Sequence, residues 1–130
     1  MQDHLAEIEG MKAAVAVIFA LFNARDLEGC LDRHAANVRF AVPMLNGPHD
    51  AAGEWGRGRA GFRDYLLMGF ERHGTLRVID VVPGGGLSVG VLVEDAKGER
   101  LEACMEFGPD GLVTQIFAFP LPARADAHAA

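Results

Sequence analysis

The chain has 130 residues and a formal net charge of −6, from 18 acidic and 12 basic side chains. This length predicts a single domain, and half of the residues are hydrophobic, so the domain can bury a sizeable core. The acidic balance argues against nucleic acid and anionic membranes as partners. No apolar run approaches the ~20 residues that a membrane-spanning helix needs. The N-terminus lacks the basic segment of a signal peptide, so we expect a cytoplasmic protein.

Two helices are predicted at the start of the chain. Apolar residues recur every three or four positions over residues 3–24, which is typical of a long amphipathic helix. Asp26 then has the character of an N-cap for a second, shorter helix over residues 26–35. The apolar face of this second helix includes Leu31 and His34. We therefore expect His34 to point toward the same interior as Leu31.

A strand and a long loop follow the second helix. Apolar side chains alternate over residues 38–42, which predicts a strand with one buried face, and Pro43 ends it. Residues 44–57 are predicted to form a loop that is long for a compact domain, and such loops often serve as lids or binding loops. The alternative is a solvated connector that Trp55 anchors to the body of the protein.

A third helix is predicted to open at residues 58–62 and to end at His73 and Gly74, because glycine commonly caps the C-terminus of a helix. Turn residues rich in glycine, proline and aspartate then divide the chain into four strands. The predicted strands are 75–82, 87–94, 99–107 and 112–119.

The domain is predicted to span residues 1–120, with residues 121–130 as a frayed tail. Four antiparallel strands need a helix layer on one face, and the first and third helices can supply it. The sequence therefore predicts an α+β domain.

Four segments, in their order and spacing, make the chain resemble the NTF2-like superfamily, in particular its SnoaL-like and ketosteroid-isomerase-like branch. The segments are residues 22–27, 38–43, 58–62 and 105–113. The resemblance implies an α+β cone, in which a curved, mostly antiparallel sheet wraps around three helices and encloses an apolar pocket. It also implies a homodimer through the outer face of the sheet. The superfamily includes isomerases, cyclases, dehydratases, epoxide hydrolases and proteins without catalytic activity, so no single reaction is implied.

Two chemistries of the superfamily can be checked residue by residue. Ketosteroid isomerases use an aspartate base, a tyrosine and a protonated aspartate, and the matching positions here are Val42, Ile18 and Ala103. All three side chains are apolar, so no base or oxyanion donor remains there. The Asp-Arg-Asp arrangement of the epoxide hydrolases cannot be placed, because Arg100 and Glu102 alternate with the residues expected to face inward. We therefore expect no ketosteroid isomerase activity.

The resemblance also implies a set of pocket-lining side chains. They are Ile18, Phe22, Phe40, Val42, Trp55, Phe62, Tyr65, Leu66, Ala103, Met105 and Ile116. Around the mouth, Tyr65 and Trp55 could be joined by three loop residues, Asn46, His49 and Glu54. The alternative for Tyr65 is a helix residue with its hydroxyl in water.

His34 and Asp80 are the candidate catalytic residues. A buried His34 imidazole could act as an acid, a base or a hydrogen-bond donor, and the alternative is a packed histidine bonded to backbone or water. Asp80 shares strand parity with Leu76 and Val78, so it faces the pocket if they do. The alternative is an exposed aspartate near a strand end. Within hydrogen-bond reach of each other, ~3 Å, the two side chains would form an acid/base pair.

Other reactive residue types carry little signal. Cys30 and Cys104 lie far apart without a CxxC spacing, which predicts free, packed thiols in a reducing compartment. The five histidines are dispersed and lack metal-ligand spacing, so we expect no metal site, and no motif indicates a cofactor. The glycines at 84–86 join two strands and predict a turn rather than a phosphate loop.

The last strand is the reason to expect a homodimer from the residues themselves. Val113, Phe117 and Phe119 share one strand parity, and Ile116 and Ala118 share the other, so both faces of this strand are largely apolar. In a monomer one face would expose an apolar patch of the kind that soluble proteins usually hide.

Taken together, these patterns favour a protein that binds a small apolar molecule. Acid/base chemistry on that molecule would make it an isomerase, cyclase, dehydratase or hydrolase. The alternative is a non-catalytic module, such as a ligand carrier, a sensor or a dimeric scaffold, and the sequence leaves open whether the protein is an enzyme.

Overall fold

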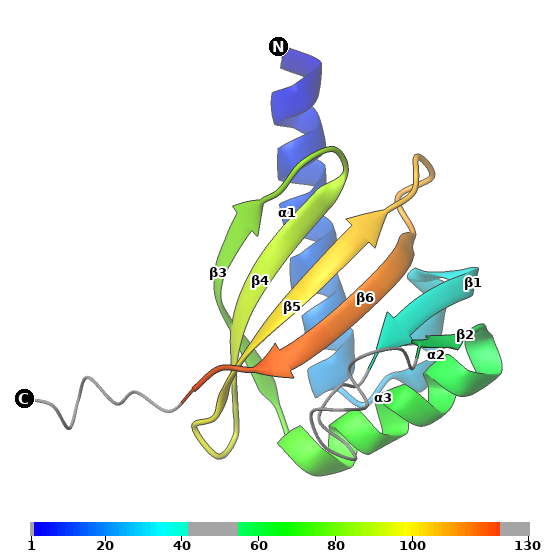
Figure 1. Cartoon of the computed structure of the whole chain (residues 1–130), viewed down its shortest axis with the longest axis vertical. Coiled ribbons are helices and arrows are strands. Elements are labelled where there is room, and N and C mark those ends of the chain that lie inside the picture. Colours follow the sequence, from blue (N-terminus) through cyan, green and yellow to red (C-terminus); the bar gives the residue numbers. More distant parts are fainter. Residues whose placement is uncertain (1, 42–54, 123–130) are drawn as a thin grey trace, which may run out of the picture.

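The computed structural model describes residues 2–41 and 55–122, without the side chains of residues 2, 3 and 55. Three helices and six strands occur in these ranges (Figure 1). In chain order they are α1 (Gln2–Asn23), α2 (Leu27–Asp32), β1 (His34–Ala41), β2 (Trp55–Arg57), α3 (Arg59–His73), β3 (Leu76–Pro83), β4 (Ser88–Asp95), β5 (Arg100–Phe107) and β6 (Val113–Pro120). None of the described helices combines the length and the hydropathy that a membrane crossing requires.

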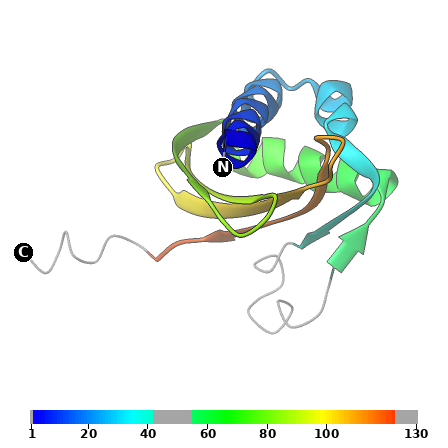
Figure 2. The same cartoon turned by 90° about the horizontal axis from the view of Figure 1, so that it is seen from above.

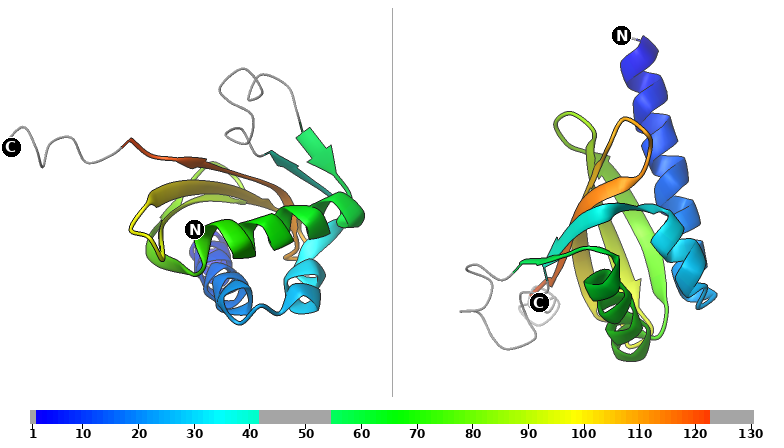
Figure 3. Two further views of the ribbon diagram at one scale, coloured as in Figure 1. Left: turned by 90° about the horizontal axis from the view of Figure 1, so that it is seen from below. Right: turned by 90° about the vertical axis from the view of Figure 1, so that its right-hand side faces the viewer.

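The strands form one curved sheet in the order β2-β1-β6-β5-β4-β3. Every neighbouring pair is antiparallel except β1 and β6, which run parallel. All three helices lie on the concave face of this sheet, and none of the described helices covers the convex face (Figures 2 and 3). The α+β cone predicted from the sequence is therefore confirmed.

The first helix is built as its apolar spacing predicts. Met11, Val15, Ile18 and Phe22, three or four residues apart, are all buried. The first turns of α1 project beyond the strands (Figure 1), and Leu5 there is 57% exposed. The core therefore begins about two turns into the helix.

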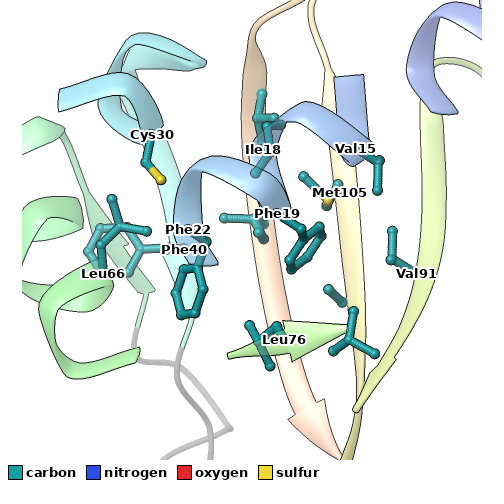
Figure 4. Packing of buried hydrophobic residues seen from close by; sticks show 14 of the residues in the cluster. Val15, Ile18, Phe19, Phe22, Cys30, Phe40, Leu66, Leu76, Val91 and Met105 are labelled. Atoms are coloured by element: carbon teal, nitrogen blue, oxygen red, sulfur yellow. The ribbon is translucent and has the colours of Figure 1, made fainter. Parts of the chain in front are cut away.

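One apolar cluster joins the helices to the sheet. Figure 4 shows Val15 and Phe19 of α1 directed toward the strands that carry Val91 and Met105, with Leu66 of α3 on the opposite flank. All five side chains are buried, and burying one side chain of this size stabilises the fold by about 1.5–3 kcal/mol. Packing against α1 thus holds the sheet in its curved form.

The second helix is shorter than the sequence predicts. Asp26 is its N-cap, and the Asp26 carboxylate accepts a hydrogen bond of 2.9 Å from the Gly29 N–H. The helix ends at Asp32, and His34 is already the first residue of β1, paired with Val113 of β6. The prediction of a helix through residue 35 is wrong, because pairing with β6 takes this stretch into the sheet.

A β-bulge changes which side chains of β3 face inward. Val78 is paired with Val93, and the next partners are Asp80 and Leu92, so the register shifts by one residue at Ile79. Leu76 and Val78 keep the inward parity, but Asp80 is exposed. The expectation that Asp80 shares the face of Leu76 and Val78 is wrong, because the bulge reverses the parity between them.

The end of the predicted loop 44–57 is a short strand, β2, which pairs with β1. Phe40 of β1 lies opposite Gly56 of β2. A Cβ atom at position 56 would clash with the Phe40 ring, so only glycine lets β2 lie this close. Val42 and the remaining loop residues, 43–54, lie outside the described residues, as do residues 123–130 of the predicted tail.

Candidate functional site

A cavity of about 130 Å³ lies between the helices and the concave face of the sheet. Its wall is almost entirely apolar, and much of it comes from α1, α3, β5 and β6. Polar side chains reach it at a few places only. These are His34, Tyr65, Arg72, His73 and Glu99.

The structure places most of the expected pocket residues on this cavity. They are Ile18, Phe22, Phe62, Tyr65, Leu66, Ala103 and Ile116. Phe40 and Met105 are buried in the core but do not line the cavity. Val42, the side chain of Trp55 and the proposed mouth residues of the loop lie outside the described part of the chain.

His34 is buried in the wall of the cavity, with only 2% of its surface exposed. Its Nδ1 lies 2.7 Å from the carbonyl oxygen of Cys30, so Nδ1–H donates and Nε2 carries the lone pair. The imidazole ring packs on Phe62, with ring centroids 4.3 Å apart. Nε2 has no hydrogen-bond partner among the described residues.

The surroundings of His34 keep it neutral. Burial lowers the pKa of the imidazole to about 4; the hydrogen bond to Cys30 opposes this shift and the positive charge of Arg59 adds to it. At pH 7 the side chain is therefore an uncharged acceptor whose lone pair is buried without a donor. Leaving such a group unpaired costs about 1–3 kcal/mol, which is a reason to look for a donor that is not part of the chain.

Two further groups near His34 are held in their protonated forms. The Tyr65 ring packs against Phe40 and Phe62, and burial raises the pKa of its hydroxyl to about 12. Burial, and then the charge of Asp26, raise the pKa of the Cys30 thiol to about 11. Tyr65 is thus a neutral donor, and Cys30 is a packing group rather than a nucleophile.

The opposite end of the cavity contains a histidine–aspartate pair that the sequence did not reveal. Nδ1 of His73, the last residue of α3, lies 3.1 Å from Oδ2 of Asp95, the last residue of β4. Oδ1 of Asp95 accepts the backbone N–H groups of Lys97 and Glu99, both at 2.9 Å. Burial disfavours the charged form of Asp95, but these hydrogen bonds outweigh it and hold its pKa below the ordinary value.

Each residue of this pair lies at a feature that the sequence predicts, but the sequence does not predict that the two meet. Asp95 opens a predicted turn and His73 ends a predicted helix, but the two lie 22 positions apart. They meet because Leu76, just after the helix, pairs with Asp95 in the sheet. Glu99 offers a third ligand atom, and the potential ligand atoms of His73, Asp95 and Glu99 all lie within 4.8 Å of one another.

Asp80 does not belong to the site. It is exposed on the convex side, and its Oδ1 accepts the N–H of its own neighbour Val81 at 3.0 Å. The expected pair of His34 and Asp80 is therefore not formed. At the positions matching the ketosteroid isomerase residues, Ile18 and Ala103 do line the cavity, and both are apolar.

No family model matches the sequence, and no curated protein matches it. Solved structures, in contrast, match over nearly the whole chain. A SnoaL-like protein of unknown function from Burkholderia thailandensis E264 is 21% identical, with a TM-score of 0.73, over 88% of this chain and 96% of that chain. An NTF2-like protein of unknown function from Burkholderia xenovorans LB400 is 16% identical, with a TM-score of 0.69, over 93% of this chain and 94% of that chain.

A third match is an enzyme. SalBIII, an epoxide hydrolase/cyclase-like enzyme with a role in pyran ring formation in the polyether salinomycin, is 20% identical, with a TM-score of 0.67, over 93% of this chain and 95% of that chain. At these identities the likeness establishes the fold. The chain has the NTF2-like fold, and the resemblance inferred from its sequence segments is confirmed at this level.

Proposed function

We propose that this protein binds a small, largely apolar molecule that carries a hydrogen-bond donor, and that the donor is received by His34. The observation that carries the proposal is the buried, unpaired Nε2 of His34, a residue that lines an apolar cavity. A ligand O–H or N–H at this nitrogen would satisfy the buried lone pair, and the apolar wall would supply the remaining binding free energy.

The size of the cavity narrows the class of ligand. An engineered cavity of about 150 Å³ binds benzene, and the volume here, about 130 Å³, is similar. A single hydroxylated ring is thus the simplest ligand that fits. A carboxylate or phosphate at His34 is disfavoured, because an anion would face a second lone pair instead of a donor.

Whether the protein is an enzyme or a binding protein depends on whether the bound molecule is chemically changed. The cavity has acid/base groups, so the protein could act as an isomerase, cyclase, dehydratase or hydrolase on this ligand. A carrier or sensor, which binds the same molecule without changing it, is the second candidate, and the seclusion of His34 from solvent favours it.

The test compares two probes that differ in one donor. Phenol and anisole share an aromatic ring, but only phenol can donate to His34. Because one hydrogen bond contributes about 1 kcal/mol or more, we expect phenol to bind roughly tenfold more tightly than anisole in calorimetry. His34→Phe should remove this preference, and Asp64→Asn, an exposed position of α3 away from the cavity, should retain it. Equal binding of the two probes to the unaltered protein, or no binding of either, would contradict the proposal.

We also propose a homodimer through the convex face of the sheet. The strand register aligns one largely apolar row across this face. From β3 to β1 it runs through Val82, Gly90, Cys104, Phe117 and Ala41. Val82 is 56% exposed, and Phe117 also stacks on Phe119, with ring centroids 6.1 Å apart. Such a row is suited to a matching surface.

Val113 does not belong to this convex face, although strand alternation predicts that it does. Val113 is buried on the concave side, because the register of β5 and β6 shifts between Val113 and Gln115. The apolar residues of β6 on the convex side are therefore Phe117 and Phe119 without Val113. Sedimentation should show a dimer at micromolar concentration, and Cys104→Glu, in the middle of the row, should give monomers. Lys97→Glu in the exposed β4–β5 turn is the control, and a monomeric unaltered protein would refute the dimer.

A further inference from the structure

An imidazole and two carboxylates meet where the end of α3 contacts the β4–β5 turn. His73 is the last residue of α3. Asp95 and Glu99 flank the turn, and the backbone N–H of Asp95 donates to the carbonyl oxygen of Glu99 at 2.8 Å. The ligand atoms that the three side chains offer all lie within 4.8 Å of one another, and the described part of the chain contains no second group of this kind. One small ion is therefore within reach of all three side chains.

The backbone of the turn fixes the group in advance. The N–H of Ala96 donates to the carbonyl oxygen of His73 at 3.0 Å, so the end of the helix and the turn are joined. Oδ1 of Asp95 accepts the N–H groups of Lys97 and Glu99, both at 2.9 Å, and Oδ2 is the oxygen that faces the imidazole. Metal-binding carboxylates in proteins are commonly oriented by such outer hydrogen bonds.

The spacing of the two inner atoms suits a shared ion. Nδ1 of His73 lies 3.1 Å from Oδ2 of Asp95. Two atoms bound to one zinc ion at about 2.0–2.1 Å in tetrahedral geometry lie about 3.3 Å apart. In the absence of an ion the Nδ1–H group bridges this gap as a hydrogen-bond donor, and an ion would take the place of its proton. Binding therefore requires little movement of either side chain.

The charges of the group favour a cation. The Asp95 carboxylate is ionised although only 1% of its side chain is exposed. Glu99 forms no ion pair with any described residue, and the neighbouring Arg100 is directed at Glu94, at 3.6 Å. Two carboxylates thus lie close together with a histidine but without a lysine or arginine bonded to either. A divalent ion would neutralise both.

The cavity provides room for such an ion. His73 and Glu99 both line it, so an ion bound between them would border the cavity. Three protein ligands leave a tetrahedral ion one open position, which water or a ligand oxygen can fill. An ion here would give this end of the cavity a positive charge, whereas the His34 end has a neutral acceptor.

We propose that His73, Asp95 and Glu99 bind a divalent transition-metal ion of the Zn²⁺ type at this end of the cavity. An imidazole nitrogen with two carboxylate oxygens suits such an ion, whereas Mg²⁺ and Ca²⁺ prefer oxygen ligands alone. The prediction of no metal site rested on the spacing of the histidines in the sequence, and this group comes together only through the fold. The proposal is independent of the proposed function, because no residue of the His34 end takes part.

The binding test uses Zn²⁺ and protein that has been freed of metal with EDTA. In calorimetry we expect one ion per chain at micromolar concentration and no binding of Mg²⁺ in the same range. His73→Gln and Glu99→Gln should each weaken Zn²⁺ binding at least ~10-fold. Glu9→Gln, an exposed position in α1 far from the β4–β5 turn (Figure 1), should match the unaltered protein. No binding by the unaltered protein, or equal binding by all variants, would overturn the proposal.

Nitrogen NMR gives a readout that needs no variant. Zn²⁺ should remove the proton from Nδ1 of His73 and shift that resonance, while the resonances of His34 stay in place. If the Nδ1–H group of His73 persists at saturating Zn²⁺, His73 and Asp95 form a hydrogen-bonded pair only, and the proposal is overturned. A shift at His34 instead of His73 would also overturn it, because the ion would then bind at the wrong end of the cavity.

Discussion

Two histidines at opposite ends of one cavity show how differently the same side chain can be used. His34 is 2% exposed, packs on Phe62 and has a single hydrogen bond, to the carbonyl of Cys30. His73 is half-buried and donates to the charged carboxylate of Asp95. Burial without a charged partner makes His34 a neutral acceptor, whereas the buried carboxylate of Asp95 fixes the orientation of the His73 ring.

The two ends also differ in what holds them together. Around His34 the fold depends on apolar packing, which leaves one polar atom unpaired. Around His73 it depends on hydrogen bonds that tie the end of α3 to the β4–β5 turn. The first end is thus suited to recognising a ligand through one contact, and the second to holding an imidazole in a fixed orientation.

The largest expected effect is the loss of stability when a buried side chain at the His34 end is truncated. Phe62, at the His34 end, is 1% exposed, and Phe62→Ala should cost about 3–5 kcal/mol in free energy of unfolding. Met68 lines the same cavity but is 41% exposed, so Met68→Ala should cost less than about 1 kcal/mol. Urea denaturation measures the free energy of unfolding of both variants, and losses of similar size would contradict this prediction.

The next effect is the pH dependence that His34 imposes on stability. The unfolded chain binds a proton at this residue below about pH 6.5, whereas the folded chain binds it only below about pH 4. The stability from neutral His34 is complete above pH 6.5 and is lost as the pH falls toward 4, by about 3 kcal/mol in total.

Urea denaturation at pH 7 and pH 4 measures this loss against a matched variant. His34→Phe lacks the titrating group, so its stability should fall by about 3 kcal/mol less than that of the unaltered protein between these pH values. An equal fall in both proteins would mean that His34 does not remain neutral in the folded state.

A smaller effect compares two aspartates. Asp95→Ala removes the acceptor of two backbone N–H groups and of His73, which should cost about 2 kcal/mol. Asp80→Ala removes an exposed carboxylate that contacts only its neighbour, so the change should stay within about 0.5 kcal/mol. Because the pKa of Asp95 is lowered, its contribution is present at neutral pH and is lost as the pH falls through the folded-state value. Equal stabilities of the two variants at pH 7 would contradict the assignment.

The smallest effect is the absence of one activity. Ile18 and Ala103 give the cavity no base and no oxyanion donor at the ketosteroid isomerase positions. A Δ5-3-ketosteroid should therefore be converted at the background rate in a spectrophotometric assay. Rapid turnover would show that a group elsewhere in the cavity acts on this substrate.

Most of the fold could be predicted from the sequence, because apolar periodicity and turn residues are local signals. The four strands after residue 75 and the N-cap at Asp26 lie where these signals place them. The end of α2 is not predictable in this way, because pairing of His34 with Val113 takes that stretch into the sheet. Tertiary pairing of this kind has no local signature.

The site was less predictable for the same reason. His34 was found through its apolar neighbours, and it does reach the cavity, although from a strand instead of a helix. Simple alternation places Asp80 on the wrong face, because a single bulged residue reverses strand parity and the sequence around Ile79 gives no sign of it. The pair of His73 and Asp95 depends on the register between β3 and β4, which only the structure supplies.

The most direct test of ligand recognition at the buried end is a nitrogen NMR titration of His34. We expect His34 to stay neutral, with its proton on Nδ1, down to about pH 4. Phenol at pH 7 should shift the Nε2 resonance through a new hydrogen bond, and anisole should leave it nearly unchanged. An imidazole that titrates near pH 6.5, or an Nε2 resonance that phenol and anisole move equally, would contradict the assignment of His34 as the buried acceptor of the cavity.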